Sequence, residues 1–286
     1  MDLPREAVHA IVAQALREDI GQGDLTTLAV IPADALAVAH VVMREAGVPA
    51  GLPLLQAVFE QVDPALTIQL HAQDGDQVSA GTAVAQITGP ARGLLTGERV
   101  ALNLIQRMSG IATTTARYVA AVAGLPVRIL DTRKTTPGLR LLEKYAVRMG
   151  GGVNHRCGLY DAVMLKDNHL ALLAAQGIDL ATAVQQARAA VGPLVKIEVE
   201  VETPEQADMA ASAGADVILL DNMSPAMLRT AVERVRGRAL LEASGGITLA
   251  TIRAVAATGV NYISVGALTH SAGALDVALD VIIPGS

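Results

Sequence analysis

The chain has 286 residues, enough for one large α/β domain or for a barrel with a smaller companion domain. Hydrophobic residues make up 51% of it and aromatic residues only 2%, so its core must come from closely packed Ala, Val, Leu and Ile. The net charge of −6 argues against nucleic acid as a partner, because nucleic-acid binding requires a basic surface.

The first 20 residues predict an amphipathic helix and not the continuous apolar run of an export signal, because Val8, Val12 and Leu16 follow helical spacing. The longest uncharged stretch, 254–275, is interrupted by glycine and polar residues and does not indicate a membrane span. Cys157 is the only cysteine, so no intrachain disulfide can form. We therefore expect a soluble, cytoplasmic protein without a membrane partner.

The first 110 residues have the pattern of a separate α+β layer. A turn-rich segment at 21–27 follows the first helix, and period-two runs at 36–43 and 66–72 predict strands. The segment 74–89 is similar to the hammerhead of lipoyl and biotinyl carriers. Those domains need an attachment lysine, and no lysine occurs before Lys134, which excludes a carrier role.

From residue 127 onward, short β-branched runs alternate with helical stretches, which indicates βα units and a parallel sheet. Prolines at 137 and 204 and the pair Ser224-Pro225 mark helix starts, and recurrent glycines mark helix ends. The predicted strands are 127–131, 161–165, 195–201, 216–220, 239–243 and 261–265.

Polar or glycine residues follow these strands, and in α/β barrels the loops after the strands form the active face. One site can therefore collect residues from several loops. Six strands are fewer than a closed eight-stranded barrel requires, so the sequence predicts an open, incomplete α/β barrel.

The densest chemical signal lies between residues 131 and 169, which carry a local charge of +3 in an acidic protein. Arg133 offers a planar guanidinium for a carboxylate or phosphate, and Lys134 and Lys166 supply compact charges, so together they can hold a dianion. The alternative is that they are solvated loop charges. We prefer a site, because these cations fall at strand ends or beside a glycine run.

His155 and Arg156 follow the flexible glycines 150–152. A lone histidine is more often structural, but beside Arg156 we interpret His155 as a hydrogen-bond donor to the substrate. Cys157 is not expected to be a nucleophile, since no base is committed to it.

Charged residues alternate along the strand 195–201, where Lys196, Glu198 and Glu200 share one face. Buried charges need partners, so reciprocal pairing or a metal is expected there. Glu200 and Asp221 offer oxygen ligands that suit Mg²⁺ bridging to phosphate. A structural salt bridge remains the alternative.

Two glycine-containing loops follow the last two predicted barrel strands. Ser244-Gly245-Gly246 and the run 264–271 follow adjacent strands late in the chain, where barrels commonly bind a phosphate on exposed backbone N–H groups.

Taken in order, these motifs resemble the quinolinate phosphoribosyltransferase family, also called nicotinate-nucleotide pyrophosphorylase (carboxylating). The resemblance covers nearly the whole chain and rests on 18–27, 97–113, 131–140, 150–159, 165–169, 198–203, 219–222, 242–247 and 262–271. It implies an N-terminal α/β sandwich domain over 1–110, completed by the tail 273–286, and an open barrel of about seven strands over 111–272. One strand beyond the six found by pattern is then expected.

The resemblance also implies the reaction: phosphoribosyl transfer from phosphoribosyl pyrophosphate to quinolinate with decarboxylation, in de novo NAD synthesis. Arg133, His155, Arg156 and Lys166 would bind the quinolinate carboxylates, with Arg99 reaching in from a neighbouring subunit of a homodimer or hexamer. Lys134, Glu200 and Asp221 would serve ribose, pyrophosphate and Mg²⁺. The 5′-phosphate would bind at Ser244, Gly245, Gly246, Val265, Gly266 and Ala267.

Two other functions remain open on the sequence. A barrel lyase would use Lys166 or Lys196 as a Schiff-base nucleophile. A non-catalytic relative would bind phosphoribosyl pyrophosphate or an oxyanion without turnover.

Overall fold

The computed structural model describes residues 3–282, which divide into two compact units. Residues 117–134 and 152–267 form one unit, which contains a parallel sheet. The rest of the described chain forms the other, which contains an antiparallel sheet. Each unit is a mixed α/β structure, as the sequence predicts.

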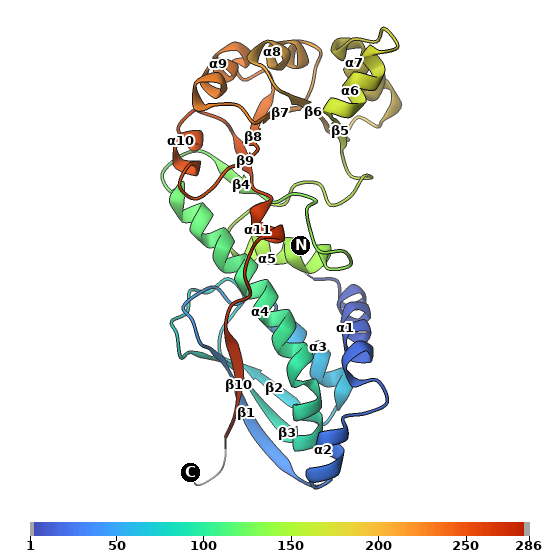
Figure 1. Ribbon diagram of the computed structural model, residues 1–286, viewed down its shortest axis with the longest axis vertical. Helices are drawn as coiled ribbons and strands as arrows, with labels where there is room; N and C mark the ends of the chain where they lie inside the picture. Colours follow the sequence, from blue (N-terminus) through green and yellow to red (C-terminus); the bar gives the residue numbers. More distant parts are fainter. Residues whose placement is uncertain (1–2, 283–286) are drawn as a thin grey trace. The chain divides into compact units, whose positions relative to one another are not determined.

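The antiparallel sheet joins the first strand of the chain, β1, to the last, β10 (Figure 1). Its strand order is β10-β1-β3-β2, and β1 pairs with β10 and β3 on its two sides. Both period-two runs form strands here, as the alternation of their side chains predicts. The strands are β1 (Leu36–Met43), β2 (Thr67–Leu70), β3 (Ala83–Pro90) and β10 (Val277–Ile282).

Helices complete this unit. α3 contacts β2 and buries Phe59, Leu54 and Leu55 completely, so the single Phe is a core residue. Asp24 caps α2 by accepting a hydrogen bond from the Thr27 N–H, so the predicted turn at 21–27 ends in a short helix. The helices are α1 (Arg5–Ile20), α2 (Leu25–Val30), α3 (Leu52–Val62), α4 (Ala91–Ala121), α5 (Arg140–Met149) and α11 (Ala267–His270).

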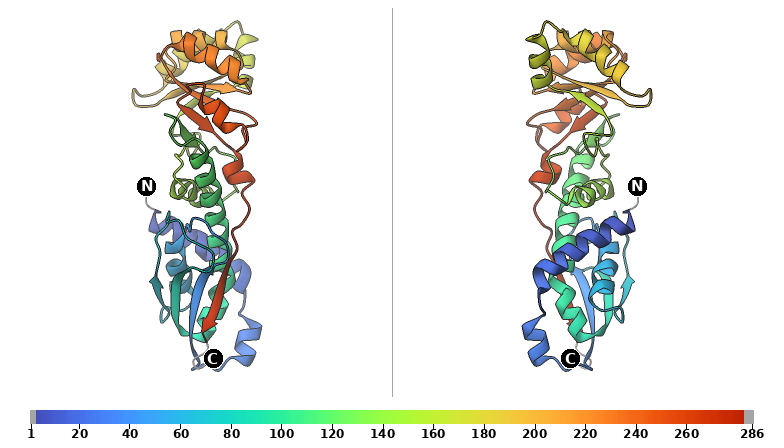
Figure 2. Two further views of the ribbon diagram at one scale, coloured as in Figure 1. Left: turned by 90° about the vertical axis from the view of Figure 1, so that its left-hand side faces the viewer. Right: turned by 90° about the vertical axis from the view of Figure 1, so that its right-hand side faces the viewer.

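All six predicted barrel strands are present and parallel, in the order β4-β9-β8-β7-β6-β5. Helices cover one face of this sheet (Figure 2), and α7 and α8 contact its strands β6 and β7. The strands are β4 (Arg128–Leu130), β5 (Val163–Leu165), β6 (Ile197–Val201), β7 (Val217–Asp221), β8 (Leu240–Ser244) and β9 (Tyr262–Ser264).

The parallel sheet is open, with β4 and β5 at its two edges. Beyond β4, an isolated parallel bridge joins Leu130 to Val153. The bridge stands where the expected seventh strand would add to the sheet. It follows the glycines 150–152, and this explains why no strand pattern marks it in the sequence.

Helices of the barrel unit begin where the sequence predicts. Thr203 caps α8 at Pro204, and Ser224 caps α9 at Pro225 through the Met227 N–H. Pro137 instead lies in a turn, because α5 begins only at Arg140. The helices are α6 (Asp167–Ala174), α7 (Leu180–Ala190), α8 (Pro204–Ser212), α9 (Pro225–Val235) and α10 (Ile252–Ala256).

The expected domain boundaries differ from the two units. The boundary at residue 110 falls inside α4, which continues unbroken to Ala121. The segment 135–151, expected in the barrel, belongs to the unit with the antiparallel sheet. Of the expected tail 273–286, β10 pairs with β1, and residues 283–286 lie outside the described residues, as do residues 1 and 2 of the expected first domain.

Across residues 3–282, none of the helices combines the length and the apolar character needed to cross a bilayer.

Candidate active site

A polar cavity of about 170 Å³ opens at the carboxyl edge of the parallel sheet. It lies where open α/β folds bind ligands, outside the carboxyl ends of the strands. Its walls are made by Thr132, Arg133, Lys134, His155, Arg156, Met164, Lys166, Glu200, Leu219, Asp221, Glu242, Ser244 and Ser264.

Strand periodicity selects the residues that face this cavity. Side chains alternate along a strand, so every second residue points to one face. The parallel register sets Glu200 beside Leu219, Leu219 beside Glu242, and Asp221 beside Ser244. The residues between them, including Val199, Leu220 and Ala243, are buried on the helix-covered face.

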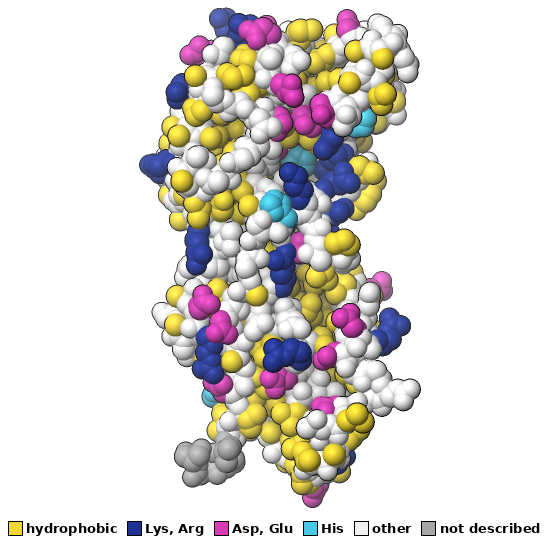
Figure 3. Space-filling model, in the orientation of Figure 1, with side chains coloured by type: hydrophobic (Ala, Val, Ile, Leu, Met, Phe, Trp, Pro, Cys, Tyr) yellow, Lys and Arg dark blue, Asp and Glu magenta, His cyan; other side chains and the backbone are white. Residues whose placement is uncertain are grey.

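Cations gather on one wall of the cavity. Arg133 and Lys134 follow β4, and Lys166 follows β5, while Arg156 lies on the loop between these strands. Figure 3 shows Lys and Arg side chains grouped beside Asp and Glu side chains on this unit. Burial, and then the charge of Arg133, lower the pKa of the Arg156 guanidinium. An anion bound here would relieve that repulsion between the two arginines.

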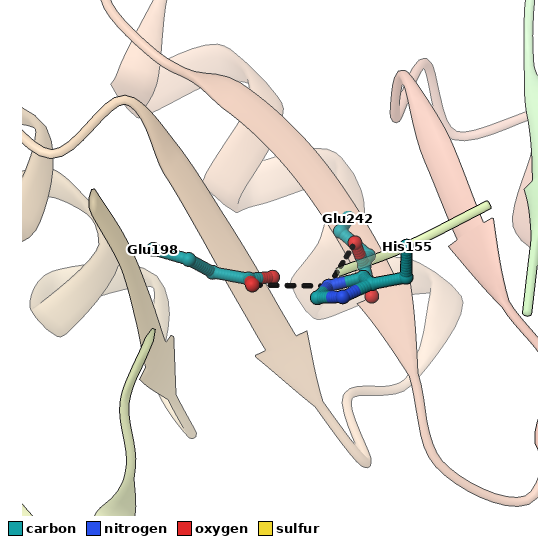
Figure 4. Close-up of side chains that lie close together, drawn as sticks. All are labelled: His155, Glu198 and Glu242. Carbon is teal, nitrogen blue, oxygen red and sulfur yellow. Dashed lines mark ion pairs between the residues drawn. The ribbon is translucent and has the colours of Figure 1, made fainter. Parts of the chain in front are cut away.

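His155 is held by the protein through both ring nitrogens, and Figure 4 shows the contacts of one of them with Glu198 and Glu242. Its Nε2 lies 3.0 Å from Glu198 Oε2 and 3.5 Å from Glu242 Oε2. Its Nδ1 accepts a hydrogen bond from the Arg156 N–H at 2.8 Å, which places the proton of the neutral ring on Nε2. His155 lines the cavity as predicted, but its Nε2–H points to the two glutamates instead of into open space.

These three residues form a compact group whose candidate ligand atoms all lie within 4.8 Å of one another. A metal-bound histidine coordinates through one nitrogen and donates the other N–H to a second group. Here Nδ1 is an acceptor, so Nε2 carries the hydrogen and cannot coordinate a metal. The group is therefore a hydrogen-bonded cluster.

Glu242 is almost completely buried, with 1% of its surface exposed. Burial, and then the neighbouring charge of Glu198, raise the pKa of Glu242 to about 7, although His155 opposes the shift. Two adjacent buried carboxylates cannot both ionise cheaply. The pair therefore retains a proton well above the ordinary pH range of a carboxyl group.

Glu200 and Asp221 form the acidic wall of the cavity. Burial raises the pKa of Glu200, the charge of Lys166 opposes this, and the charge of Asp221 adds to the rise. Asp221 also accepts a hydrogen bond from the Asn222 amide at 2.6 Å. Two oxygen donors that repel each other beside a lysine fit a hard divalent cation shared with a phosphate ligand.

The loop after β8 needs glycine at position 245. Gly245 has a φ of 97°, and an added Cβ atom would lie 2.1 Å from Asn222 Oδ1. The glycine lets this loop pack against the loop after β7. Ser244 lines the cavity, whereas Gly245, Gly246, Val265, Gly266 and Ala267 follow the ends of β8 and β9 and are not among its lining residues.

Three residues weighed in the sequence lie elsewhere. Arg99 is an exposed residue of α4 in the other unit. Lys196 pairs with Asp216 at 2.9 Å, before β6 and β7 begin, and so lies at the opposite edge of the sheet. Cys157 is half-buried, and its N–H donates to Asp161.

Sequence reasoning missed Glu242, whose only signal is a charged residue inside an apolar strand run, as at Glu198. It also assigned no role to Thr132, Met164 and Leu219, which are neutral cavity residues, whereas Ser264, another lining residue, begins the run 264–271 that is expected to bind a phosphate.

Comparisons with known proteins agree over nearly the whole chain. Residues 24–109 match the N-terminal domain of quinolinate phosphoribosyl transferase, and residues 111–280 match its C-terminal domain. A probable nicotinate-nucleotide pyrophosphorylase (carboxylating) of Bacillus subtilis is 48% identical over 266 residues, covering 93% of this chain and 90% of the relative. The corresponding Mycobacterium leprae protein is 43% identical and covers 98% of this chain and 99% of its own.

Solved structures agree as well. NadC from Streptococcus pyogenes is 44% identical, with a TM-score of 0.93 over 99% of this chain and all of that chain (100%). A human nicotinic acid phosphoribosyltransferase, 15% identical with a TM-score of 0.60, shares the fold alone.

Proposed function

Because this chain belongs to the quinolinate phosphoribosyl transferase family, we propose that the cavity at the carboxyl edge of its parallel sheet binds quinolinate and phosphoribosyl pyrophosphate together. The enzyme transfers the phosphoribosyl group to quinolinate with loss of CO₂, giving nicotinate mononucleotide and pyrophosphate in NAD biosynthesis. The observation that supports binding of both substrates in this cavity is that the cavity has a cationic wall and an acidic wall.

Quinolinate carries two carboxylates, and the cationic wall supplies matching charges. Arg133 and Arg156 bind them as planar donors, and Lys166 adds a compact charge. Electrostatic repulsion between the two arginines supports an anion between them. His155 forms part of the same wall, and its ring is oriented by Glu198.

The bond-forming step needs no general base. The pyridine nitrogen has a lone pair and attacks the anomeric carbon of the ribose, while pyrophosphate leaves from that carbon. Lys134 stabilises the negative charge that grows on the leaving group. After transfer the ring nitrogen is cationic, and it stabilises the electron pair that stays on the adjacent ring carbon when the carboxylate on that carbon leaves as CO₂. A proton from water then adds to this carbon, so the protein has to orient that carboxylate.

Glu200 and Asp221 would hold Mg²⁺ together with the substrate phosphates, as their oxygen donors suit this ion. When bound, Mg²⁺ supplies charge neutralisation for pyrophosphate. Lys166, which opposes the raised pKa of Glu200, keeps that carboxylate available as a ligand.

The 5′-phosphate is proposed to bind at the ends of β8 and β9. Ser244 offers a hydroxyl at the cavity wall, and Gly245, Gly246, Val265, Gly266 and Ala267 offer backbone N–H groups.

Arg99 is proposed to act in a neighbouring subunit of a homodimer or hexamer, so that each site is shared. Its exposure on α4 leaves it accessible to another chain. We also propose a cytoplasmic location, which the single cysteine supports.

The test is release of labelled CO₂ from carboxyl-labelled quinolinate by purified protein with Mg²⁺ and phosphoribosyl pyrophosphate. Release is expected only when all three additions are present. Binding of phosphoribosyl pyrophosphate without release would instead identify a non-catalytic relative, and borohydride trapping of a carbonyl substrate on Lys166 would identify a lyase.

A further inference from the structure

Asp131 is a completely buried carboxylate at the end of β4, with 0% of its surface exposed. One carboxylate oxygen accepts from the Asn154 amide at 2.6 Å, and the other accepts from the His155 N–H at 2.9 Å. It does not line the cavity, so its contacts within the protein must account for its burial there.

The main chain alone holds this turn weakly. Val153 donates to the Ile129 carbonyl at 2.8 Å, and the Asp131 N–H donates to the Val153 carbonyl at 3.2 Å. This isolated bridge is the only β pairing of Val153 among the described residues. A longer strand would continue this ladder at position 155, since alternate residues of a parallel strand bond to one neighbour. The Asp131 carboxylate accepts the His155 N–H instead, and it also accepts from the Asn154 side chain.

The next contacts lead to the cavity. The Arg156 N–H donates to His155 Nδ1, so the ring of His155 and the backbone of Arg156 are fixed together. The Arg156 guanidinium also donates to the Ala162 carbonyl at 3.2 Å. A shift of the 154–156 turn would therefore move both side chains that line the cavity.

We propose that Asp131 and Asn154 are positioning residues for quinolinate: their side-chain hydrogen bond sets the turn that presents His155 and Arg156. The inference rests on the proposed role of those two residues in quinolinate binding. It assigns Asp131 no contact with substrate. Loss of this hydrogen bond should weaken quinolinate binding and leave the binding of phosphoribosyl pyrophosphate at Glu200, Asp221 and Ser244 unchanged.

The test uses a carboxylate–amide exchange. Asn154→Asp places a second carboxylate, on a half-buried residue, against the buried Asp131 carboxylate, and their repulsion should displace the turn. The double variant Asp131→Asn/Asn154→Asp restores one carboxylate and one amide in exchanged positions. Asp131→Ala removes both acceptors. Initial rates are measured against each substrate with the other saturating, and folding is followed by thermal unfolding.

Asn154→Asp and Asp131→Ala should raise the KM for quinolinate by about 10- to 100-fold, with the KM for phosphoribosyl pyrophosphate little changed. The exchange variant should recover most of the quinolinate affinity lost by Asn154→Asp. If Asp131→Ala does not fold, the comparison of Asn154→Asp with the exchange variant still decides the question.

Asp216→Asn is the matched control, because Asp216 also accepts a backbone N–H, from Ile197 at 2.9 Å, but lies at the opposite edge of the same sheet. It should lower thermal stability without changing the KM for quinolinate.

An exchange variant no better than Asn154→Asp, or equal effects on the KM values of both substrates, would overturn the inference. Arg156→Ala separates failure of the proposed function of Arg156 from failure of the positioning role of Asp131. If it leaves the KM for quinolinate unchanged, the proposed function of Arg156 has failed, and the positioning role fails with it. If it raises that KM and Asp131→Ala does not, only the positioning role is overturned.

Discussion

The imidazole of His155 donates from Nε2 to Glu198, 3.0 Å away, and Glu242 approaches the same nitrogen from a second strand at 3.5 Å. The two acids come from β6 and β8, which are separated by β7 in the sheet. Both glutamates are buried, so the imidazole contacts two acidic side chains in a region of low dielectric constant. This arrangement fixes the ring and makes stability depend on pH.

The substitution Glu242→Gln should make stability less sensitive to pH. The pKa of Glu242 is raised from 4.5 to about 7, so the folded protein keeps a proton that the unfolded chain releases between these values. The free energy of unfolding of the wild type therefore falls as pH rises through that window, and falls no further above about pH 7. Relative to the wild type, the variant should gain up to about 3 kcal/mol between pH 4.5 and 8, measured by urea unfolding.

Glu205→Gln is the control for this experiment, since Glu205 pairs with Arg234 on the surface. Its difference from the wild type should stay within about 1 kcal/mol at all pH values. A pH-independent difference for Glu242→Gln would show that Glu242 titrates as an ordinary carboxyl group.

Arg133→Ala should weaken binding of the transition state, because the variant loses charge-assisted hydrogen bonds to a desolvated carboxylate. We expect a loss of about 2 to 4 kcal/mol in kcat/KM for quinolinate. Arg128→Ala is the matched control, because Arg128 is an exposed residue at the start of β4, the strand that Arg133 follows. Near-normal turnover of quinolinate by Arg133→Ala would remove Arg133 from the site.

Removal of divalent cations should abolish product formation, and added Mg²⁺ should restore it. Asp221→Asn should raise the Mg²⁺ concentration for half-maximal rate by about tenfold or more, because a charged oxygen donor becomes a neutral one. Asp208→Asn on α8, where Asp208 pairs with Arg238, should leave that concentration unchanged. Full activity in the presence of a chelator would contradict the metal proposal.

Mixing Arg99→Ala with Lys134→Ala should regenerate activity if each site takes Arg99 from a neighbour. In a randomly reassembled dimer, half of the molecules are hybrids with one intact site, so about a quarter of the wild-type activity is expected. A mixture of Arg133→Ala with Lys134→Ala should recover none, because both residues line the same cavity. No recovery after proven subunit exchange would argue that Arg99 does not act in trans.

Local patterns predicted the six barrel strands, all of which are present. The runs at 195–201 and 216–220 became β6 and β7, because β-branched and apolar side chains suit buried strands. Arg133, Lys134, Lys166, Glu200 and Asp221 then had to reach one edge, since parallel strands share their carboxyl ends.

Other features could not be predicted from local patterns. The bridge at Val153 depends on a partner more than 20 residues away in β4, and a single bridge leaves no periodicity. The helix α4 continues through residue 110, where the two matched family domains meet, and its unbroken length is a feature that the expected boundary did not indicate. The pairing of Lys196 with Asp216 likewise depends on the neighbouring strand β7.

The sequence by itself determined which elements form and which charged groups stand at their ends, because propensity, capping and side-chain alternation act over a few residues. Only the tertiary structure decided which of these groups meet. Glu198 and Glu242 share the ring of His155, and Asp131 holds the turn before Arg156, because parallel pairing and burial bring distant residues together and require each buried charge to find a partner.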